Sequence, residues 1–375
     1  MSNRRLGSCV LLLTSVLAGA LAARTPQATS RPASRGETIV AAMQKQGLVG
    51  LSVAWISDGK VGATLSLGYA DRERAIRADD ATLYRWASIS KPITAVAAMQ
   101  LWEVGKLDLD ADVRKLVPEW PEKPWVISPR QLLAHQGGVV HYANGKVVRR
   151  ERAYAEPHPF ADVVKALDMF ADSPLVCEPG TKHSYSTHGY ILLGAVVQRA
   201  GGEPYWEQVR KGIAEPLGMK TFQPDYQWVA LANRAVGYKK RPGLPAERST
   251  DTDVSWKLPG GGFLSNIGDL ARFGAGLLRG ELVASETLDL MWTRARTKDG
   301  KLTGYGLGFG VRERGEEIEV AHSGGQEKTS TLLVLRPRQR AGIALMCNTE
   351  GADLGELAQQ LLGDRGLPPT SRAGK

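Results

Sequence analysis

Hydrophobic residues repeat with two different periods along this chain, and the order of these periods predicts how the fold is built. Near the beginning, 51–56 and 61–69 alternate between apolar and polar positions on either side of Asp58-Gly59, which is typical of a β-hairpin. Near the end, four further runs predict successive strands at 305–312, 317–322, 329–335 and 342–347.

The long middle of the chain has the period of helices instead. Helices are predicted at 37–46, 86–105, 129–135, 161–170, 189–200, 205–213, 267–278, 285–291 and 353–362. Because sequential strands pair and a sheet buries its faces against helices, the pattern predicts an α+β fold. We expect one antiparallel sheet flanked by helices, formed by about 36–85 and 300–363, with an inserted, mostly helical lobe at about 86–299.

The two ends of the chain differ from the rest. Arg4-Arg5, an apolar run at 10–21 and the small residues after it match the zones of a secretory signal peptide, which we place at 1–23. A membrane anchor is the alternative, but the run is shorter than the roughly 20 residues that a span needs. Residues 24–35 have the composition of a linker, and 364–375 are expected to be a flexible tail. A periplasmic or secreted protein is therefore predicted, with no stable membrane span after signal removal.

Composition and charge narrow the class of protein. With 43% apolar and 23% charged residues over 375 positions, the chain can bury a globular core. The net charge of +9 comes from scattered basic residues, so we expect a solvated surface, with some attraction to an anionic cell envelope, rather than nucleic-acid binding. The histidines lack metal-ligand spacing, so neither a metal nor a cofactor is expected. Cys177 and Cys347 are expected to be buried thiols, although an oxidising compartment would also permit a disulfide.

The stretch at 86–106 carries the first chemical signal. Ser88 and Lys91 are three residues apart at the start of an apolar run, and residues with this spacing share one face of a helix. Pro92 is compatible with a first helical turn, which would place Ser88 at the positive end of the helix dipole. An amine within reach activates a hydroxyl, so the pair predicts a nucleophilic serine.

Two later stretches supply the other groups that acyl transfer needs, namely a proton shuttle and donors for an oxyanion. Tyr185 lies in the polar segment HSYSTHGY (183–190), just before an apolar helix. The alternating segment EIEVAHSGG (317–325) carries three further candidates to the end of a strand: His322, Ser323 and Gly324. A backbone N–H near Gly325 would pair with that of Ser88 as an oxyanion hole.

The order of these motifs resembles that of one known family. Ser-x-x-Lys, then Tyr-x-Thr, then His-x-Gly is similar to the serine β-lactamase and penicillin-binding-protein-like hydrolase superfamily, most of all to its mitochondrial serine β-lactamase-like branch and the bacterial relatives of that branch. The resemblance covers about 36–363 and rests also on LLAHQGGVVHY (132–142) and PGGGFLSNIGDL (259–270). It implies Ser88 as nucleophile, Lys91 as its activating partner, Tyr185 as general base and acid, and a substrate contact at 322–325. It also implies the antiparallel sheet with a helical lobe.

Two positions depart from the usual motifs of that family, and both concern substrate recognition. Thr187 stands where relatives often have Asn, so a hydroxyl replaces an amide that orients a substrate. His322 stands where many β-lactamases have Lys, and an unperturbed His is mostly neutral at neutral pH. Carboxylate recognition is therefore expected to be weaker, which favours neutral esters or internal peptide bonds over carboxylate-bearing β-lactams.

Two other segments spell similar motifs in less suitable places. Tyr142-Ala143-Asn144 has the usual Tyr-x-Asn form, but no helix follows it, so Tyr185 is preferred as the catalytic tyrosine. Tyr142 and His135 are instead expected to line the loops beside the cleft. Lys328-Thr329-Ser330 resembles Lys-Thr-Gly but begins a predicted strand, so His322 keeps that role.

The residues and the resemblance together predict an exported serine hydrolase. It would cleave an ester or amide through an acyl-enzyme on Ser88, as a peptidase or esterase. A β-lactamase or D-alanyl-D-alanine carboxypeptidase is the first alternative, and a non-catalytic scaffold or binding protein is the second. The expected partner is a small-molecule or peptide substrate, whose identity the sequence leaves open together with the oligomeric state.

Replacement of Ser88 by Ala should abolish acylation, because only this serine opens a predicted helix with a lysine on its face. Ser57 has a lysine at the same spacing in Lys60, but across a predicted hairpin turn, so Ser57→Ala is the matched control and should leave acylation intact. Labelling with a fluorophosphonate probe, with the adduct located by mass spectrometry, measures both. Acylation that persists in Ser88→Ala would refute the assignment.

Overall fold

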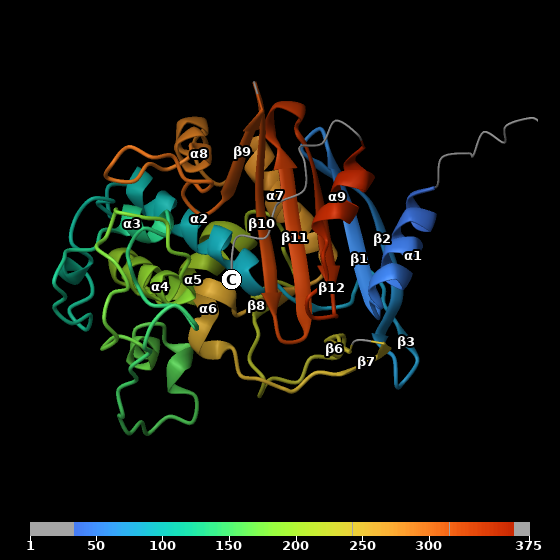
Figure 1. The fold of residues 1–375 in the computed structure, drawn as a ribbon, viewed down its shortest axis with the longest axis horizontal. Helices are drawn as coiled ribbons and strands as arrows, with labels where there is room; N and C mark the ends of the chain where they lie inside the picture. The colour runs from blue at the N-terminus through green and yellow to red at the C-terminus, as the bar shows by residue number, and fades with distance from the viewer. Residues whose placement is uncertain (1–33, 242, 315, 364–375) are drawn as a thin grey trace, which may run out of the picture.

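One antiparallel sheet organises the chain in the computed structural model, which describes residues 34–241, 243–314 and 316–363. Its strands are β1 (Gly50–Ser57), β2 (Lys60–Asp71), β3 (Ile76–Arg77), β9 (Gly310–Arg314), β10 (Glu317–Gln326), β11 (Thr329–Arg336) and β12 (Ala341–Cys347). Within the described residues, their order is β3-β2-β1-β12-β11-β10-β9. The N-terminal hairpin and the C-terminal meander join where β1 pairs with β12, from Leu51 opposite Cys347 to Ile56 opposite Gly342 (Figure 1). The predicted α+β fold with one antiparallel sheet is confirmed.

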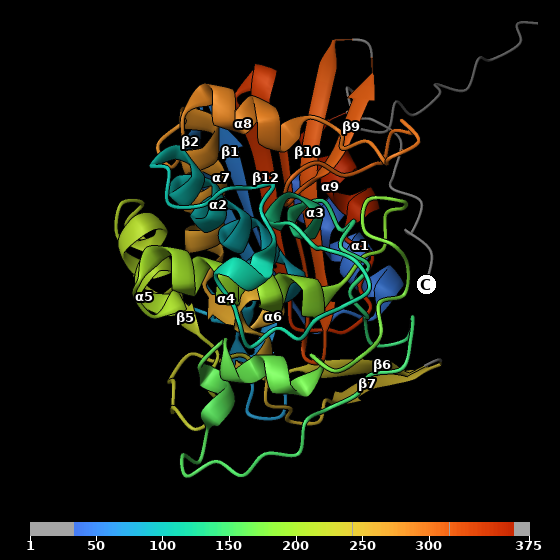
Figure 2. The ribbon, with the colours of Figure 1, turned by 90° about the vertical axis from the view of Figure 1, so that its left-hand side faces the viewer.

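Helices cover both faces of this sheet (Figure 1, Figure 2). α1 (Arg35–Gln46) and α9 (Gly355–Leu362) pack together on one face, and α7 (Ile267–Arg279) packs on the other. Val53 of β1 lies in the cluster under α1 and α9, whereas its neighbour Ala54 lies in the main core. Because successive side chains of a strand point to opposite faces, both faces of β1 are buried. α7 belongs by sequence to the predicted helical lobe, yet it packs on the sheet.

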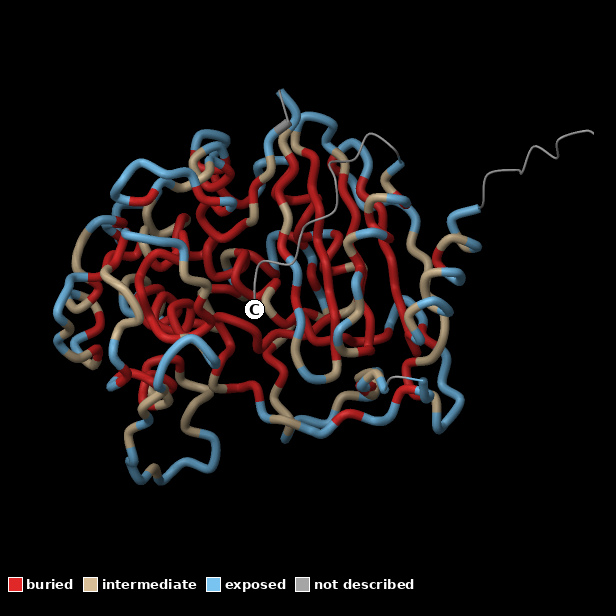
Figure 3. The backbone as a smooth tube through the Cα atoms, viewed as in Figure 1, coloured by how far each residue is buried: buried red, intermediate tan, exposed pale blue. Residues whose placement is uncertain are grey.

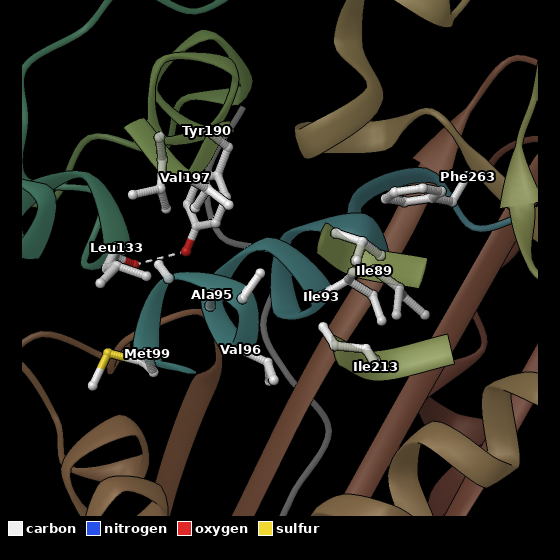
Figure 4. Close-up of a cluster of buried hydrophobic side chains, with 14 of the residues drawn as sticks. Ile89, Ile93, Ala95, Val96, Met99, Leu133, Tyr190, Val197, Ile213 and Phe263 are labelled. Carbon is white, nitrogen blue, oxygen red and sulfur yellow. Dashed lines mark hydrogen bonds between the residues drawn. The ribbon is translucent and has the colours of Figure 1, made fainter. Parts of the chain in front are cut away.

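The remaining helices form a lobe around α2. They are α2 (Ser90–Glu103), α3 (Pro129–Leu133), α4 (Thr187–Gly201), α5 (Tyr205–Val209), α6 (Leu258–Gly261) and α8 (Ser285–Trp292). Every residue of α2 from Ser90 to Met99 is buried, as expected of a helix that is apolar on all sides (Figure 3). Figure 4 shows Ala95 and Met99 of α2 on the same side of the cluster as Tyr190 of α4, whose hydroxyl donates to the Leu133 carbonyl at 2.8 Å. Among the described residues, no helix combines the length and apolarity needed to cross a membrane.

Several predicted elements are corrected by the structure. The helix predicted at 161–170 is wrong, because this segment forms only two short 3₁₀ turns, Pro159–Ala161 and Lys165–Met169. The Asp162 carboxylate accepts from the Val164 N–H and so competes with a helical hydrogen bond. The strand predicted from Tyr305 begins only at Gly310, because the chain turns at 306–309: the Gly306 N–H donates to the Phe309 carbonyl at 2.9 Å, and Gly308 has a φ of 91°, a conformation that glycine adopts readily. β10 runs beyond His322 to Gln326, further than predicted.

Other parts of the prediction fall outside the described residues or are refined by them. The proposed signal peptide, most of the linker and the tail lie outside the described residues. A hairpin of β6 (Tyr238–Arg241) and β7 (Leu244–Arg248) was not predicted, because its sequence is too polar to alternate. Cys177 and Cys347 are both free thiols; Cys347 is buried as predicted, whereas Cys177 is only partly buried.

A second, smaller sheet holds the segment that precedes Ser88. In it, β8 (Phe263–Ser265) lies between β4 (Tyr84–Arg85) and β5 (Gln223–Pro224). The Arg85 guanidinium donates to the Asp225 carboxylate at 2.5 Å, and both side chains are at least 95% buried. Arg234 reaches the same carboxylate at 3.2 Å. The segment three residues before Ser88 is thus tied to a distant part of the chain by a buried ion pair.

The Asp225→Asn variant should unfold more easily, because it leaves two guanidinium groups without their shared counter-charge. Loss of one partner from a buried ion pair costs about 3–5 kcal/mol of unfolding free energy. The exposed pair of Asp110 with Arg130 is the matched control, and Asp110→Asn should cost about 0–1 kcal/mol. Urea denaturation measures both, and equal losses would contradict the importance of burial.

Candidate active site

Ser88 lies in a 3₁₀ turn, Ala87–Ile89, that leads directly into α2. The turn begins under strain, because Ala87 has a φ of 48°, a left-handed conformation that residues with a side chain rarely adopt. Hydrogen bonds from both sides hold it: the Trp86 N–H donates to the Phe263 carbonyl at 2.8 Å, and the Thr331 hydroxyl donates to the Trp86 carbonyl at 2.9 Å. Strain of this kind persists only where surrounding structure imposes it, and it is concentrated at functional sites.

Lys91 is fully buried in the first turn of α2 and contacts three oxygen atoms. Its Nζ lies 3.0 Å from Oγ of Ser88, 3.1 Å from Oγ1 of Thr187 and 2.7 Å from the carbonyl oxygen of Gly260. No carboxylate pairs with it among the described residues. Burial, and then the positive charge of Lys257, hold the pKa of Lys91 well below its ordinary value. This environment favours the neutral amine over the ammonium.

The three contacts of Lys91 determine how a neutral amine would be oriented. Such an amine has two protons and one lone pair, and the Gly260 carbonyl can only accept a hydrogen bond, so it takes one proton. The Thr187 hydroxyl can accept the second. The lone pair is then directed at the Ser88 hydroxyl, which is the arrangement of a general base and its nucleophile. Thr187, expected as a substrate contact, thus acts on Lys91 in this structure.

Tyr185 joins this pair although it is 97 residues from Ser88 in sequence. Nζ of Lys91 lies 4.8 Å from the centre of its ring. Burial raises the pKa of Tyr185, and its hydrogen bond with Ser88 acts in the opposite direction. The group is therefore a phenol at neutral pH, able to donate a proton to a leaving atom beside Ser88.

Tyr142 lies outside this triad and faces an open pocket. Its side chain is 50% exposed, and its ring is 5.4 Å from that of His188 and 6.4 Å from that of Trp256. The pocket has a volume of about 390 Å³ and is lined by Tyr142, Val147, Arg149, Met169, His188 and Trp256. Tyr142 thus lines the space beside the cleft, while Tyr185 contacts Ser88.

The third motif runs past the Ser88 turn on β10. A Cβ at Gly324 would come within 2.5 Å of the Trp86 carbonyl oxygen, so only glycine permits this close approach. Gly325, the next residue, has open space where a side chain would stand, and Ser323 is exposed. The backbone at 325 therefore lies along the turn of Ser88. An oxyanion hole made from the N–H groups of Ser88 and Gly325 stays a prediction.

His322 is 6% exposed, and both of its ring nitrogens have partners within the protein. Nδ1 lies 2.7 Å from the Ser323 carbonyl oxygen, to which it can only donate, so Nε2 accepts from the Tyr305 hydroxyl at 2.9 Å. Burial, and then the charge of Lys91, lower the pKa of His322 to about 3. The side chain is neutral and leaves no free polar atom for a substrate carboxylate.

Lys328, the alternative for the third motif, lies elsewhere. It occupies the turn between β10 and β11 with a φ of 73°, and its ammonium pairs with Asp251. The structure instead adds residues that the sequence analysis did not assign to the site, namely Gly260, Tyr305 and Lys257. Gly260 belongs to the segment PGGGFLSNIGDL (259–270), which supported the family resemblance but was given no role in the site. The spacing of hydrophobic residues does not indicate that the Gly260 carbonyl would accept a hydrogen bond from Lys91.

Comparisons with known proteins agree with this geometry and show the family to which the chain belongs. The chain belongs to the Beta-lactamase family, whose model matches residues 36–364. The human mitochondrial serine beta-lactamase-like protein LACTB is 30% identical, over 78% of this chain and 70% of that protein. The octameric penicillin-binding protein homologue from Pyrococcus abyssi is 25% identical, with a TM-score of 0.74 over 88% of this chain and 76% of its own. EstCE1, a hydrolase with promiscuous acyltransferase activity, shares the fold with a TM-score of 0.73 at 21% identity, over 87% and 97% of the two chains.

The Lys91→Arg variant should be nearly as inactive as Lys91→Ala, because a guanidinium does not give up its proton. We expect ester hydrolysis to fall by about 10²–10⁴-fold, the usual contribution of a general base. In the wild type, the rate should rise with pH as Lys91 loses its proton, at a lower pH than an ordinary lysine because its pKa is lowered. The measurement is the pH–rate profile on a p-nitrophenyl ester, with Lys328→Arg as control. Near-native turnover in Lys91→Arg would show that only the positive charge is needed.

Proposed function

We propose that this chain is an exported serine hydrolase that cleaves an ester or amide through an acyl-enzyme on Ser88, as a peptidase or esterase. The proposal rests on the three hydrogen-bond contacts of Lys91. A buried amine without a carboxylate partner, whose lone pair is directed at a serine hydroxyl 3.0 Å away, is suited to remove a proton from that serine.

The first half of the reaction would form the acyl-enzyme. Lys91 takes the proton of Ser88 as Oγ bonds to the substrate carbonyl carbon, and the carbonyl oxygen becomes an oxyanion that accepts from the N–H groups of Ser88 and Gly325. Tyr185 donates its phenolic proton to the leaving oxygen or nitrogen as the scissile bond breaks. The proton held by Lys91 then passes to the Tyr185 phenolate, so that both groups return to their starting states.

The second half would hydrolyse the acyl-enzyme. Lys91 takes a proton from the attacking water and returns it to Oγ of Ser88 as the carboxylic acid leaves. The EstCE1 likeness supports acyl transfer on this fold, because its name describes a hydrolase with acyltransferase activity. A β-lactamase or D-alanyl-D-alanine carboxypeptidase would use the same steps on another substrate, and the penicillin-binding protein homologue favours this second candidate. A periplasmic or secreted location rests on residues 1–23 alone.

The Thr187→Val variant tests the orientation of the amine. Without the hydroxyl, one Lys91 proton loses its acceptor, and the lone pair is no longer directed at Ser88, so the rate of acylation should fall about tenfold, the effect of one lost hydrogen bond. Thr187→Ser keeps the hydroxyl and should stay near the wild-type rate. The measurement is the rate of fluorophosphonate labelling at Ser88, with a penicillin probe in parallel. No adduct with either probe, in protein shown to be folded, would favour the non-catalytic scaffold.

A further inference from the structure

Lys257 is a buried lysine whose Nζ has no hydrogen bond or ion pair among the described residues. Burial lowers the pKa of this amine, as it does for Lys91, so an anion beside Lys257 would stabilise its charged form. Its side chain belongs to a residue that is 8% exposed, just before α6, the helix whose Gly260 carbonyl accepts from Lys91. Nζ lies 5.7 Å from the ring centre of Tyr142 and 5.8 Å from that of Trp256. These are cation–π contacts, which hold a cation without neutralising it.

The charged groups around Lys257 do not compensate a positive charge on its amine. Arg85 has the same sign and acts against it. Glu327 and Asp253 have the opposite sign and act in its favour, but neither forms an ion pair with it in the structure described here. A buried ammonium that lacks a paired anion is unusual, because desolvation of a charge is costly unless a partner compensates it. An anion from outside the chain would complete the environment.

The position of Lys257 indicates what such an anion would be attached to. Tyr142 and Trp256, the two rings that contact its ammonium, also line the open pocket of about 390 Å³. That pocket is within the usual size range of sites for small organic groups. Val147 and Met169 contribute apolar surface to it, and Arg149 contributes a second cation. The positive charge of Lys257 also acts on Lys91, whose pKa it lowers.

We propose that Lys257 binds a carboxylate of the substrate, and that the pocket of Tyr142 and Trp256 takes the organic group next to it. The substrate would then be an ester or amide with a carboxylate near the scissile bond. This inference rests on the proposed function. It revises the expectation of neutral substrates, which considered only His322 as the source of a cation. In this structure the cation comes from another segment of the chain.

Two roles of Lys257 must be separated, since its charge also lowers the pKa of Lys91. Loss of this electrostatic effect would change the pH–rate profile for all substrates alike. Loss of a carboxylate contact would raise KM only for substrates that carry a carboxylate. Comparison of matched charged and neutral substrates therefore distinguishes recognition from tuning of the base.

Kinetics on two substrate pairs test the proposal. The first pair is p-nitrophenyl butyrate and mono-p-nitrophenyl glutarate, with the carboxylate in the acyl group. The second is phenyl acetate and 4-acetoxybenzoate, with the carboxylate in the leaving group. In Lys257→Met, KM for the charged member of at least one pair should rise about tenfold or more relative to its neutral partner, as expected for loss of one charge-assisted hydrogen bond. Lys257→Arg should retain the preference, and Lys211→Met, at an exposed pair with Glu203, is the control.

A change that is equal for charged and neutral members of both pairs, or no change at all, would overturn the carboxylate site. Binding without turnover separates this result from failure of the proposed function. Ligand-observed NMR should show benzoate binding more tightly than benzamide to the Ser88→Ala protein, and Lys257→Met in that background should remove the difference. Selective benzoate binding in a wild type that hydrolyses no ester would refute the hydrolase and retain the site. Absence of both would overturn the two proposals together, and thermal unfolding verifies that each variant is folded.

Discussion

The burial of Lys91 without a carboxylate is the constraint on which the rest of the site depends. A lysine in water is protonated and cannot act as a base, whereas desolvation penalises the charged form and keeps the amine available. The fold supplies this desolvation by placing Lys91 in α2, which is buried on all sides from Ser90 to Met99. It then supplies two oxygen acceptors besides Ser88, and neither carries a charge that would restore the ammonium.

The buried groups around Lys91 add no negative charge to the site. His135 is buried, its Nδ1 accepts from the Ser186 N–H at 3.1 Å, and burial holds its pKa well below the ordinary value. Its ring lies 4.2 Å from that of Tyr185 and 4.8 Å from that of Tyr305. Nε2 of His135 has no partner within the described chain, so the wall beside Tyr185 contains an unsatisfied polar atom but no negative charge. The positive charge of Lys257 adds to the penalty on a charged Lys91.

Close backbone approaches bring these groups together. A Cβ at Gly260 would lie 2.7 Å from a methyl group of Thr187, and one at Gly324 would lie 2.5 Å from the carbonyl oxygen of Trp86. The absence of side chains at these glycines lets α6 and β10 approach the Ser88 turn. Tight packing from several directions keeps the turn in one conformation. This packing maintains the strained φ of Ala87, and the buried Arg85–Asp225 pair holds the segment just before it.

The sequence by itself determined what depends on near neighbours in the chain. Helical spacing predicted that Ser88 and Lys91 share a face, and alternation predicted β1, β2 and β10 to β12, because hydrophobic periods report which side of an element is buried. Only the tertiary structure decided which distant groups meet: the Gly260 carbonyl with Lys91, Tyr305 with His322, and Lys257 with the ring of Tyr142. It also decided that 161–170 is not a helix: the Asp162 carboxylate that accepts from the Val164 N–H is held by the side-chain amide of Gln198, which donates to it at 3.0 Å. These outcomes depend on contacts between residues tens to hundreds of positions apart, and a hydrophobic period contains no information about partners across that distance.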